Sequence, residues 1–264
     1  MSQALLWAAA GTGFDFSMTA LGAATVVLLR GALHAAMQRI FLGFAAGVMI
    51  AAAVWSLLLP AIEQADAAGA AGWQVAAGGT ALGLALMLLL DGLLPHLHRG
   101  AARAEGLPSS LRRTTLLVLA VTLHNIPEGM AVGLSFALAA QHSADVGLRA
   151  GAAALALGIG IQNFPEGAAV ALPLRAEGLP RGRAFACGAL SGAVEPIFGL
   201  AVVLAAAQLA PAMPWLLSAA AGAMLYVVVE ELIPAAHLGE HSHSGTLGVM
   251  AGFLVMMVLD TALG

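Results

Sequence analysis

The stretch TTLLVLAVTLHNIPEGMAVGLSFALA, at residues 114–139, decides the fold of this chain together with its neighbour AGAAALALGIGIQNFPEGAAVALPL, at residues 150–174. A helix needs about 20 mostly apolar residues to cross the core of a bilayer, and both stretches exceed that length. Each nevertheless carries a polar motif near its middle, at residues 124–129 and 162–167. An ionisable side chain at bilayer depth costs at least about 2.5 kcal/mol, so these motifs indicate function.

The composition of the whole chain excludes a water-soluble domain. Of its 264 residues, 61% are hydrophobic and 9% are charged, whereas soluble domains carry about 25% charged residues. The net charge of −4 and the lack of a basic stretch argue against a nucleic-acid partner. We therefore predict an all-α membrane protein in a lipid bilayer, with eight transmembrane helices in a single domain over residues 1–264. The predicted spans are residues 14–29, 40–60, 74–94, 114–139, 150–174, 184–210, 215–236 and 247–263.

The arginines give the predicted bundle an orientation, because positive residues stay on the cytoplasmic side. Of the ten arginines, only Arg149 falls outside the loops of one side. Because the number of spans is even, both termini are then outside the cytoplasm, and residues 95–113 form a long cytoplasmic loop. We expect a multi-pass protein of the plasma membrane, the inner membrane of a bacterium. The arginines of the predicted cytoplasmic side are Arg30, Arg39, Arg99, Arg103, Arg112, Arg113, Arg175, Arg181 and Arg183.

The two polar motifs, His-Asn-Ile-Pro-Glu-Gly and Gln-Asn-Phe-Pro-Glu-Gly, have the same spacing. The first and fifth residues of each motif are four apart, so they share one helix face. These residues are His124 and Glu128 in the first motif, and Gln162 and Glu166 in the second. Because consecutive spans run antiparallel, we expect the two motifs to meet at similar depth.

A proline lies inside each motif, and a third proline follows Glu195 on the sixth span. Since proline cannot donate to the carbonyl four residues back, we expect kinks at Pro127, Pro165 and Pro196, with carbonyl oxygens turned inward. Imidazole, carboxylate, amide and carbonyl groups would then converge. Such a mixed nitrogen and oxygen set suits Zn²⁺, Fe²⁺, Mn²⁺ and similar ions, so we predict a metal site inside the bundle.

Buried groups of this kind are also compatible with roles that involve no transported metal. A single buried His or Glu can link helices by hydrogen bonds, but clustered carboxylates repel one another unless they bind a cation or take up protons. A proton-coupled transporter of a non-metal substrate is one alternative, and an intramembrane metalloenzyme is another. The enzyme is disfavoured, because no HExxH motif occurs and the carboxylates are spread over several helices. We expect no catalytic residue and no catalytic cofactor.

The paired motifs on the fourth and fifth of eight spans resemble those of the ZIP (Zrt/Irt-like) divalent metal transporter family, and particularly its bacterial GufA-like branch. The resemblance covers essentially the whole chain. It implies transport of divalent metal ions toward the cytoplasm, chiefly Zn²⁺, with Cd²⁺, Fe²⁺ and Mn²⁺ as alternatives. It implies no enzymatic activity, and a homodimer is left open.

The same resemblance implies the ligands of a binuclear metal centre between the fourth, fifth and sixth spans, with help from the second. Asn163 stands where some relatives have an aspartate, and a neutral amide there weakens the case for a tight second metal position. The implied ligands are His124, Asn125, Glu128, Gln162, Asn163, Glu166, Glu195 and Met49.

Further polar residues lie toward the predicted ends of the spans. Asp15 and Asp260 are expected near the outer membrane interface. At the inner end of the seventh span, a group of acidic and histidine residues could form an exit path for the ion, although an ordinary solvated helix end accounts for them equally well. The residues of this predicted exit path are Glu230, Glu231, His237, His241 and His243.

Overall fold

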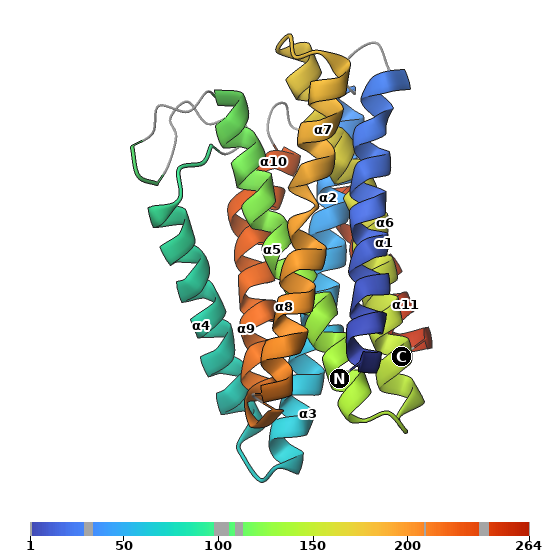
Figure 1. Cartoon of the computed structure of the whole chain (residues 1–264), viewed down its shortest axis with the longest axis vertical. Helices are drawn as coiled ribbons and strands as arrows, with labels where there is room; N and C mark the ends of the chain where they lie inside the picture. The colour runs from blue at the N-terminus through green and yellow to red at the C-terminus, as the bar shows by residue number, and fades with distance from the viewer. Residues whose placement is uncertain are drawn as a thin grey trace.

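A computed structural model of the chain describes residues 2–28, 34–97, 106–108, 113–208, 210–237 and 243–263. The described residues form one bundle of long helices that run roughly side by side (Figure 1). The elements are α1 (Ser2–Leu28), α2 (Ala35–Ala52), η1 (Ala53–Leu58), α3 (Leu59–Ala67), α4 (Gly72–Leu93), α5 (Arg113–Gln141), α6 (Val146–Ala176), α7 (Arg181–Ser191), α8 (Val194–Gln208), η2 (Ala210–Ala212), α9 (Met213–Val227), η3 (Val228–Leu232), α10 (Ile233–His237) and α11 (Ser244–Leu263).

Within the described ranges, these elements make the eight spans that the sequence predicts. Three spans combine several elements: α2, η1 and α3; α7 and α8; and α9, η3 and α10. By length and composition, five of the eight spans are apolar enough to cross a membrane. The remaining three are α1, α5 and α6, each of which carries buried polar residues near its middle. Those same three helices position most of the polar site described below.

The first span is the one whose predicted bounds are wrong. The sequence places its start near residue 14, but α1 begins at Ser2 and runs to Leu28. Thr12, Asp15 and Thr19 lower the local hydropathy, yet all three are buried against neighbouring helices. Asp15 therefore lies halfway along α1, at the depth of the bundle centre, and the expectation of an interfacial position is corrected.

The sequence predicts a kink at Pro196 in the sixth span, and the structure interrupts this span a few residues earlier. α7 ends at Ser191, Gly192 and Ala193 form a turn, and α8 starts at Val194. Pro196 consequently lies in the first turn of α8, where its missing N–H would have no helical partner anyway. Pro127 and Pro165 lie inside the continuous helices α5 and α6, and the bends expected at these two prolines stay predictions.

Small residues allow the helices to pack closely, as is common when lipid supplies no hydrophobic drive between helices. Gly22 of α1 faces the backbone of Phe164 on α6, and Gly167 of α6 faces the carbonyl of Thr19. A Cβ atom at either glycine would overlap that backbone. α1 and α6 are thus held in a fixed register at the depth of the second polar motif.

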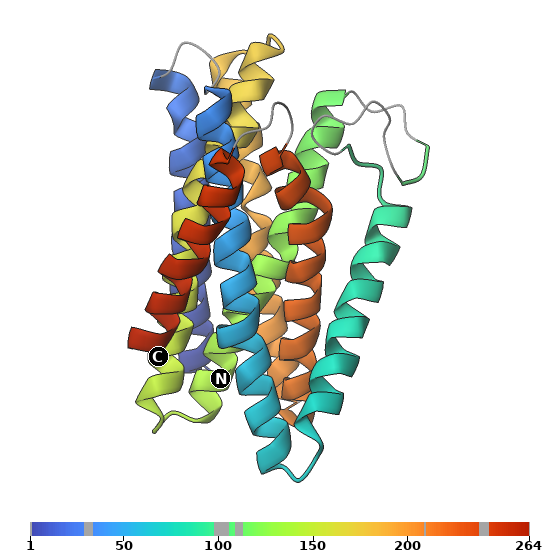
Figure 2. The same ribbon diagram turned by 180° about the vertical axis from the view of Figure 1, so that it is seen from behind.

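The outer helices lie on opposite sides of this core. Figure 2 shows α4 along one edge, α11 along the other, and α2 between them. α2 packs against α11, and α4 packs against α9. The labels of both termini lie at the same end of the bundle in both views, as an even number of spans requires (Figures 1 and 2).

Candidate metal centre

The two motifs meet in the middle of the bundle, as their spacing predicts. His124 and Glu128 come from α5 and Glu166 comes from α6, and each offers one ligand atom within 4.8 Å of the other two. All three side chains are buried. His124 Nε2 lies 3.8 Å from Glu166 Oε1, a separation that a shared cation would span. One imidazole nitrogen with two carboxylates is a ligand set suited to zinc and related ions.

The motif amides connect this cluster to neighbouring carboxylates. Gln162 Nε2 donates to Glu128 Oε1 over 2.7 Å, and Asn163 Nδ2 donates to Glu195 Oε2 over 2.8 Å. Gly129 brings α5 close to the second of these contacts, because its Cα faces the backbone of Glu195 without a side chain between them. Gln162, Asn163 and Glu195 are fully buried.

Several oxygens and one nitrogen of this region have no hydrogen-bond partner among the described residues. An unsatisfied buried polar atom costs about 1–3 kcal/mol, so a group of them points to a ligand that satisfies them together. A divalent cation does this, because oxygen and imidazole lone pairs coordinate it directly. The atoms are Asp15 Oδ1 and Oδ2, His124 Nε2, Asn125 Oδ1, Glu128 Oε2, Gln162 Oε1, Asn163 Oδ1 and Glu166 Oε1.

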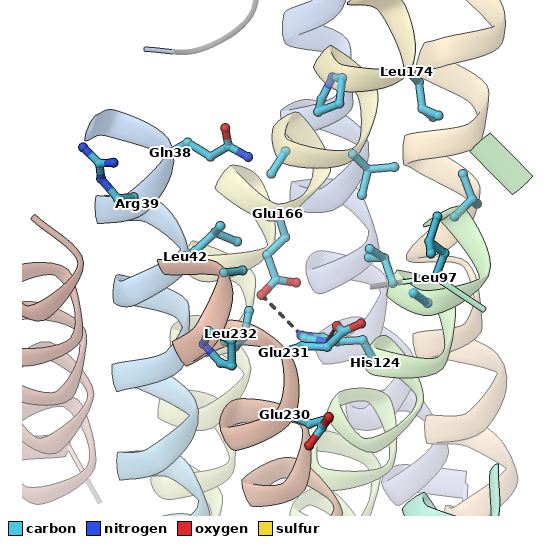
Figure 3. A pocket seen from close by; sticks show the side chains of 18 of the residues that line it. Gln38, Arg39, Leu42, Leu97, His124, Glu166, Leu174, Glu230, Glu231 and Leu232 are labelled. Carbon is cyan, nitrogen blue, oxygen red and sulfur yellow. Dashed lines mark hydrogen bonds and ion pairs between the residues drawn. The ribbon is translucent and has the colours of Figure 1, made fainter. Parts of the chain in front are cut away.

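Glu231 contacts the cluster from η3, a π-helical turn that continues α9. Its Oε2 atom lies 2.8 Å from His124 Nδ1. Figure 3 shows Glu166 and Glu231 next to the His124 ring, and the two carboxylates face different ring nitrogens. A carboxylate on one ring nitrogen orients the imidazole and leaves the other nitrogen for a metal. The sequence predicts Glu231 for the exit path, but its contact with His124 is missed, because the two residues are 107 positions apart.

A cavity of about 480 Å³ ends at this cluster. His124 and Glu166 line it near the middle of the bundle, and Arg39, near the start of α2, lines it farther out (Figure 3). Glu177, just after the end of α6, is also among the lining residues. Glu230 and Glu231 also line it. The motif residues are therefore reached from the end of the bundle where the loops rich in arginine begin.

The remaining predicted site residues occupy different places. Asn125 Nδ2 donates to the carbonyl of Ser191 at the end of α7. Met49 is fully buried on α2 within the main apolar core. His237 contacts the carbonyl of Ile233 and the hydroxyl of Thr246, and it is exposed, as is His243. His241 lies outside the described residues.

Two aspartates expected at the interface are in fact buried. Asp260 on α11 accepts a 2.6 Å hydrogen bond from Ser56 of η1. Asp15 on α1 is fully buried, and its backbone carbonyl lies 3.4 Å from Asn163 Nδ2. A helix of 27 residues centred on Asp15 would have been found by extending the first span toward the N-terminus, since residues 2–10 are largely apolar.

Comparison with known proteins points in the same direction as the geometry. A family model described as ZIP Zinc transporter matches residues 101–260. Zinc transporter ZIPB of Bordetella bronchiseptica is 45% identical over 98% of this chain and 82% of its own length. Zinc transporter ZIP11 of Homo sapiens is 38% identical over 99% of this chain and 97% of its own length. Zinc transporter GufA of Myxococcus xanthus is 40% identical over 80% of this chain and 81% of its own length.

Proposed function

This chain belongs to the ZIP family of zinc transporters, and we propose that it takes up Zn²⁺ toward the cytoplasm through the centre formed by His124, Glu128 and Glu166. Divalent metal transport follows from the family, and the transported ion is the substrate of the centre. The observation that carries the proposal is the convergence of these three buried ligands, within 4.8 Å of one another, at the end of a cavity.

The ligand set explains how the ion could leave water. A zinc ion loses part of its hydration shell on entering the bundle, and imidazole nitrogen and carboxylate oxygen replace the lost waters. Glu231, bound to His124 Nδ1, orients the ring so that Nε2 faces Glu166. Glu231 also lines the cavity, so it is the next carboxylate that a departing ion meets on the way out.

The arginine distribution identifies the cytoplasmic side of the bundle, toward which we propose that the ion moves. The cavity leads to the end of the bundle that carries Arg39 and Glu177, which the positive-inside rule assigns to the cytoplasm. We infer a plasma membrane location, in the inner membrane of a bacterium, with both termini outside and residues 95–113 as a cytoplasmic loop. The whole chain then forms one transmembrane transport domain.

The competing functions make different demands on the site. An intramembrane metalloenzyme needs a metal with an open position and a general base beside it, and a proton-coupled transporter of a non-metal substrate needs no metal at all. The three carboxylates that surround the imidazole of His124, those of Glu128, Glu166 and Glu231, favour a bound and transported cation over both. Cd²⁺, Fe²⁺ and Mn²⁺ are the other ions that these donors accept.

Uptake by proteoliposomes containing the purified chain tests the proposal. We expect time-dependent Zn²⁺ entry that Cd²⁺ inhibits, with Fe²⁺ and Mn²⁺ as weaker competitors. His124→Ala should reduce the rate to that of empty liposomes, whereas His142→Ala, at an exposed histidine just after the end of the same helix, should leave it unchanged. Equal rates for His124→Ala and the unaltered chain, or no entry of any divalent ion, would contradict the proposal.

A further inference from the structure

Both carboxylate oxygens of Asp15 are buried, and neither has a hydrogen-bond partner among the described residues. It lies halfway along α1, far from either end of the helix. An ionised carboxylate in the interior of a membrane protein is costly unless it is paired, so a position like this one indicates a missing partner. The side-chain hydrogen bonds at Asp15 go to its backbone carbonyl, which accepts from Thr19 Oγ1 at 3.2 Å and from Asn163 Nδ2 at 3.4 Å.

The surroundings of Asp15 come from three helices that meet at one point. Glu195 of α8 accepts from Asn163 Nδ2 at 2.8 Å, and its other oxygen lies 3.4 Å from the hydroxyl of Thr19 on α1. Asn163 Nδ2 contacts both Glu195 Oε2 and the backbone carbonyl of Asp15, and the Thr19 hydroxyl contacts both Glu195 Oε1 and the same carbonyl. Asp15 therefore lies in α1 next to Asn163 and Glu195, beside the motif cluster.

α1 is fixed in the register that brings Asp15 to this place. Gly22 and Gly167 put the backbones of α1 and α6 in direct contact, and Gly192, at the start of the α7–α8 turn, lies directly against the side chain of Thr19. Any larger residue at these three positions would push α1 outward. Asp15 therefore cannot turn to solvent by a small shift of its helix.

We propose that Asp15 is a metal ligand contributed by α1, and that it joins Asn163 and Glu195 at the second position of the binuclear centre that the family resemblance implies, next to the ion held by His124, Glu128 and Glu166. The inference rests on the proposed function, because it adds a ligand and a helix to the same centre. Asn163 is a neutral residue on α6, and Asp15 supplies from α1 the negative charge that this residue lacks. A half-turn of the Asn163 amide exchanges its nitrogen and oxygen, so that its unbonded Oδ1 joins the two carboxylates.

The chemistry of this second position differs from that of the first. Its donors are all oxygen atoms, which suit harder ions such as Mn²⁺ as well as Zn²⁺, whereas the imidazole of His124 favours Zn²⁺. The ligand that the geometry selects is therefore a divalent cation rather than an organic molecule. A lone proton on Asp15 is the alternative, and it predicts no dependence of metal binding on this residue.

Zinc binding to the purified full chain in detergent tests the proposal, with bound metal measured over a range of free Zn²⁺. The unaltered chain should bind two ions in two steps. Asp15→Asn should weaken the second step at least about tenfold and leave the first within about twofold. The double variant Asp15→Asn/Asn163→Asp, which moves the carboxylate from α1 to α6, should restore the second step. Asp260→Asn, the same change at a buried carboxylate that accepts a hydrogen bond from Ser56, should alter neither step.

The outcomes separate the two proposals. If the unaltered chain binds no Zn²⁺, the proposed function fails. If it binds one ion only, or if Asp15→Asn leaves both steps unchanged, the role of Asp15 is refuted while the first position survives. Should Asp15→Asn fail to fold, Asn163→Asp alone decides, because a third carboxylate beside Asp15 and Glu195 should tighten the second step at least about tenfold. An unchanged second step in that variant also refutes the proposal.

Discussion

The two cation positions that we propose in this bundle differ in where their ligands come from and in what they face. The first uses His124 and Glu128 from one helix turn and Glu166 from the matching turn of the next helix, and it opens on the cavity. The second joins Asp15, Asn163 and Glu195 from three helices, and none of these residues is among the described residues that line the cavity. An ion at the first position would therefore exchange with water through the cavity. An ion at the second position would be enclosed by protein.

Glu128 is the residue whose loss should affect both positions most severely. Its Oε1 atom accepts from Gln162, its Oε2 atom has no hydrogen-bond partner among the described residues, and the next residue, Gly129, packs against the backbone of Glu195. Glu128→Gln should therefore weaken both binding steps, the first by at least about 100-fold, or about 2.7 kcal/mol. Zinc titration of the purified variant measures this, with Glu63→Gln on α3, at an exposed carboxylate, as the control. An effect on one step alone would show that the two positions are independent.

The difference between the positions also explains what the sequence could predict. The eight spans follow from apolar length, and the meeting of His124, Glu128 and Glu166 follows from spacing of four residues on adjacent antiparallel helices. The α1 position could not be predicted in this way, because a hydropathy profile treats Asp15 as the edge of a span when it is in fact the middle.

Contacts between residues that are far apart in the sequence are the other part of the site that could not be predicted. Asn163 meets the backbone of Asp15 across 148 positions, and Glu231 meets His124 across 107. No local spacing encodes either pair. The position of the break between α7 and α8, at Gly192, could not be predicted either, because glycine is frequent throughout this chain.

The contact between α1 and α6 gives a second way to separate the positions. Gly167→Ala places a Cβ against the carbonyl of Thr19, so α1 must move or strain, at a cost of about 2 kcal/mol. We expect a lower thermal midpoint in detergent and a weakened second binding step, with the first step less affected. Gly151→Ala lies on the same helix with open space around it and should instead stabilise the chain, by up to about 1 kcal/mol. Equal midpoints for the two variants would mean that the α1–α6 contact does not position Asp15.

The contact of Glu231 with His124 allows the first position to be changed alone. Glu231→Gln keeps a hydrogen bond to Nδ1 but removes the charge that orients the ring, so the first binding step should weaken about tenfold, or about 1.4 kcal/mol, while the second stays within about twofold. Glu230→Gln, one residue earlier and exposed, should shift the first step by much less. Because Glu231 contacts the imidazole and Asp15 lies next to Asn163, a selective loss at the first step would show that each position has its own carboxylate. Equal losses at both steps would instead mean that Glu231 acts through the charge of the whole cluster.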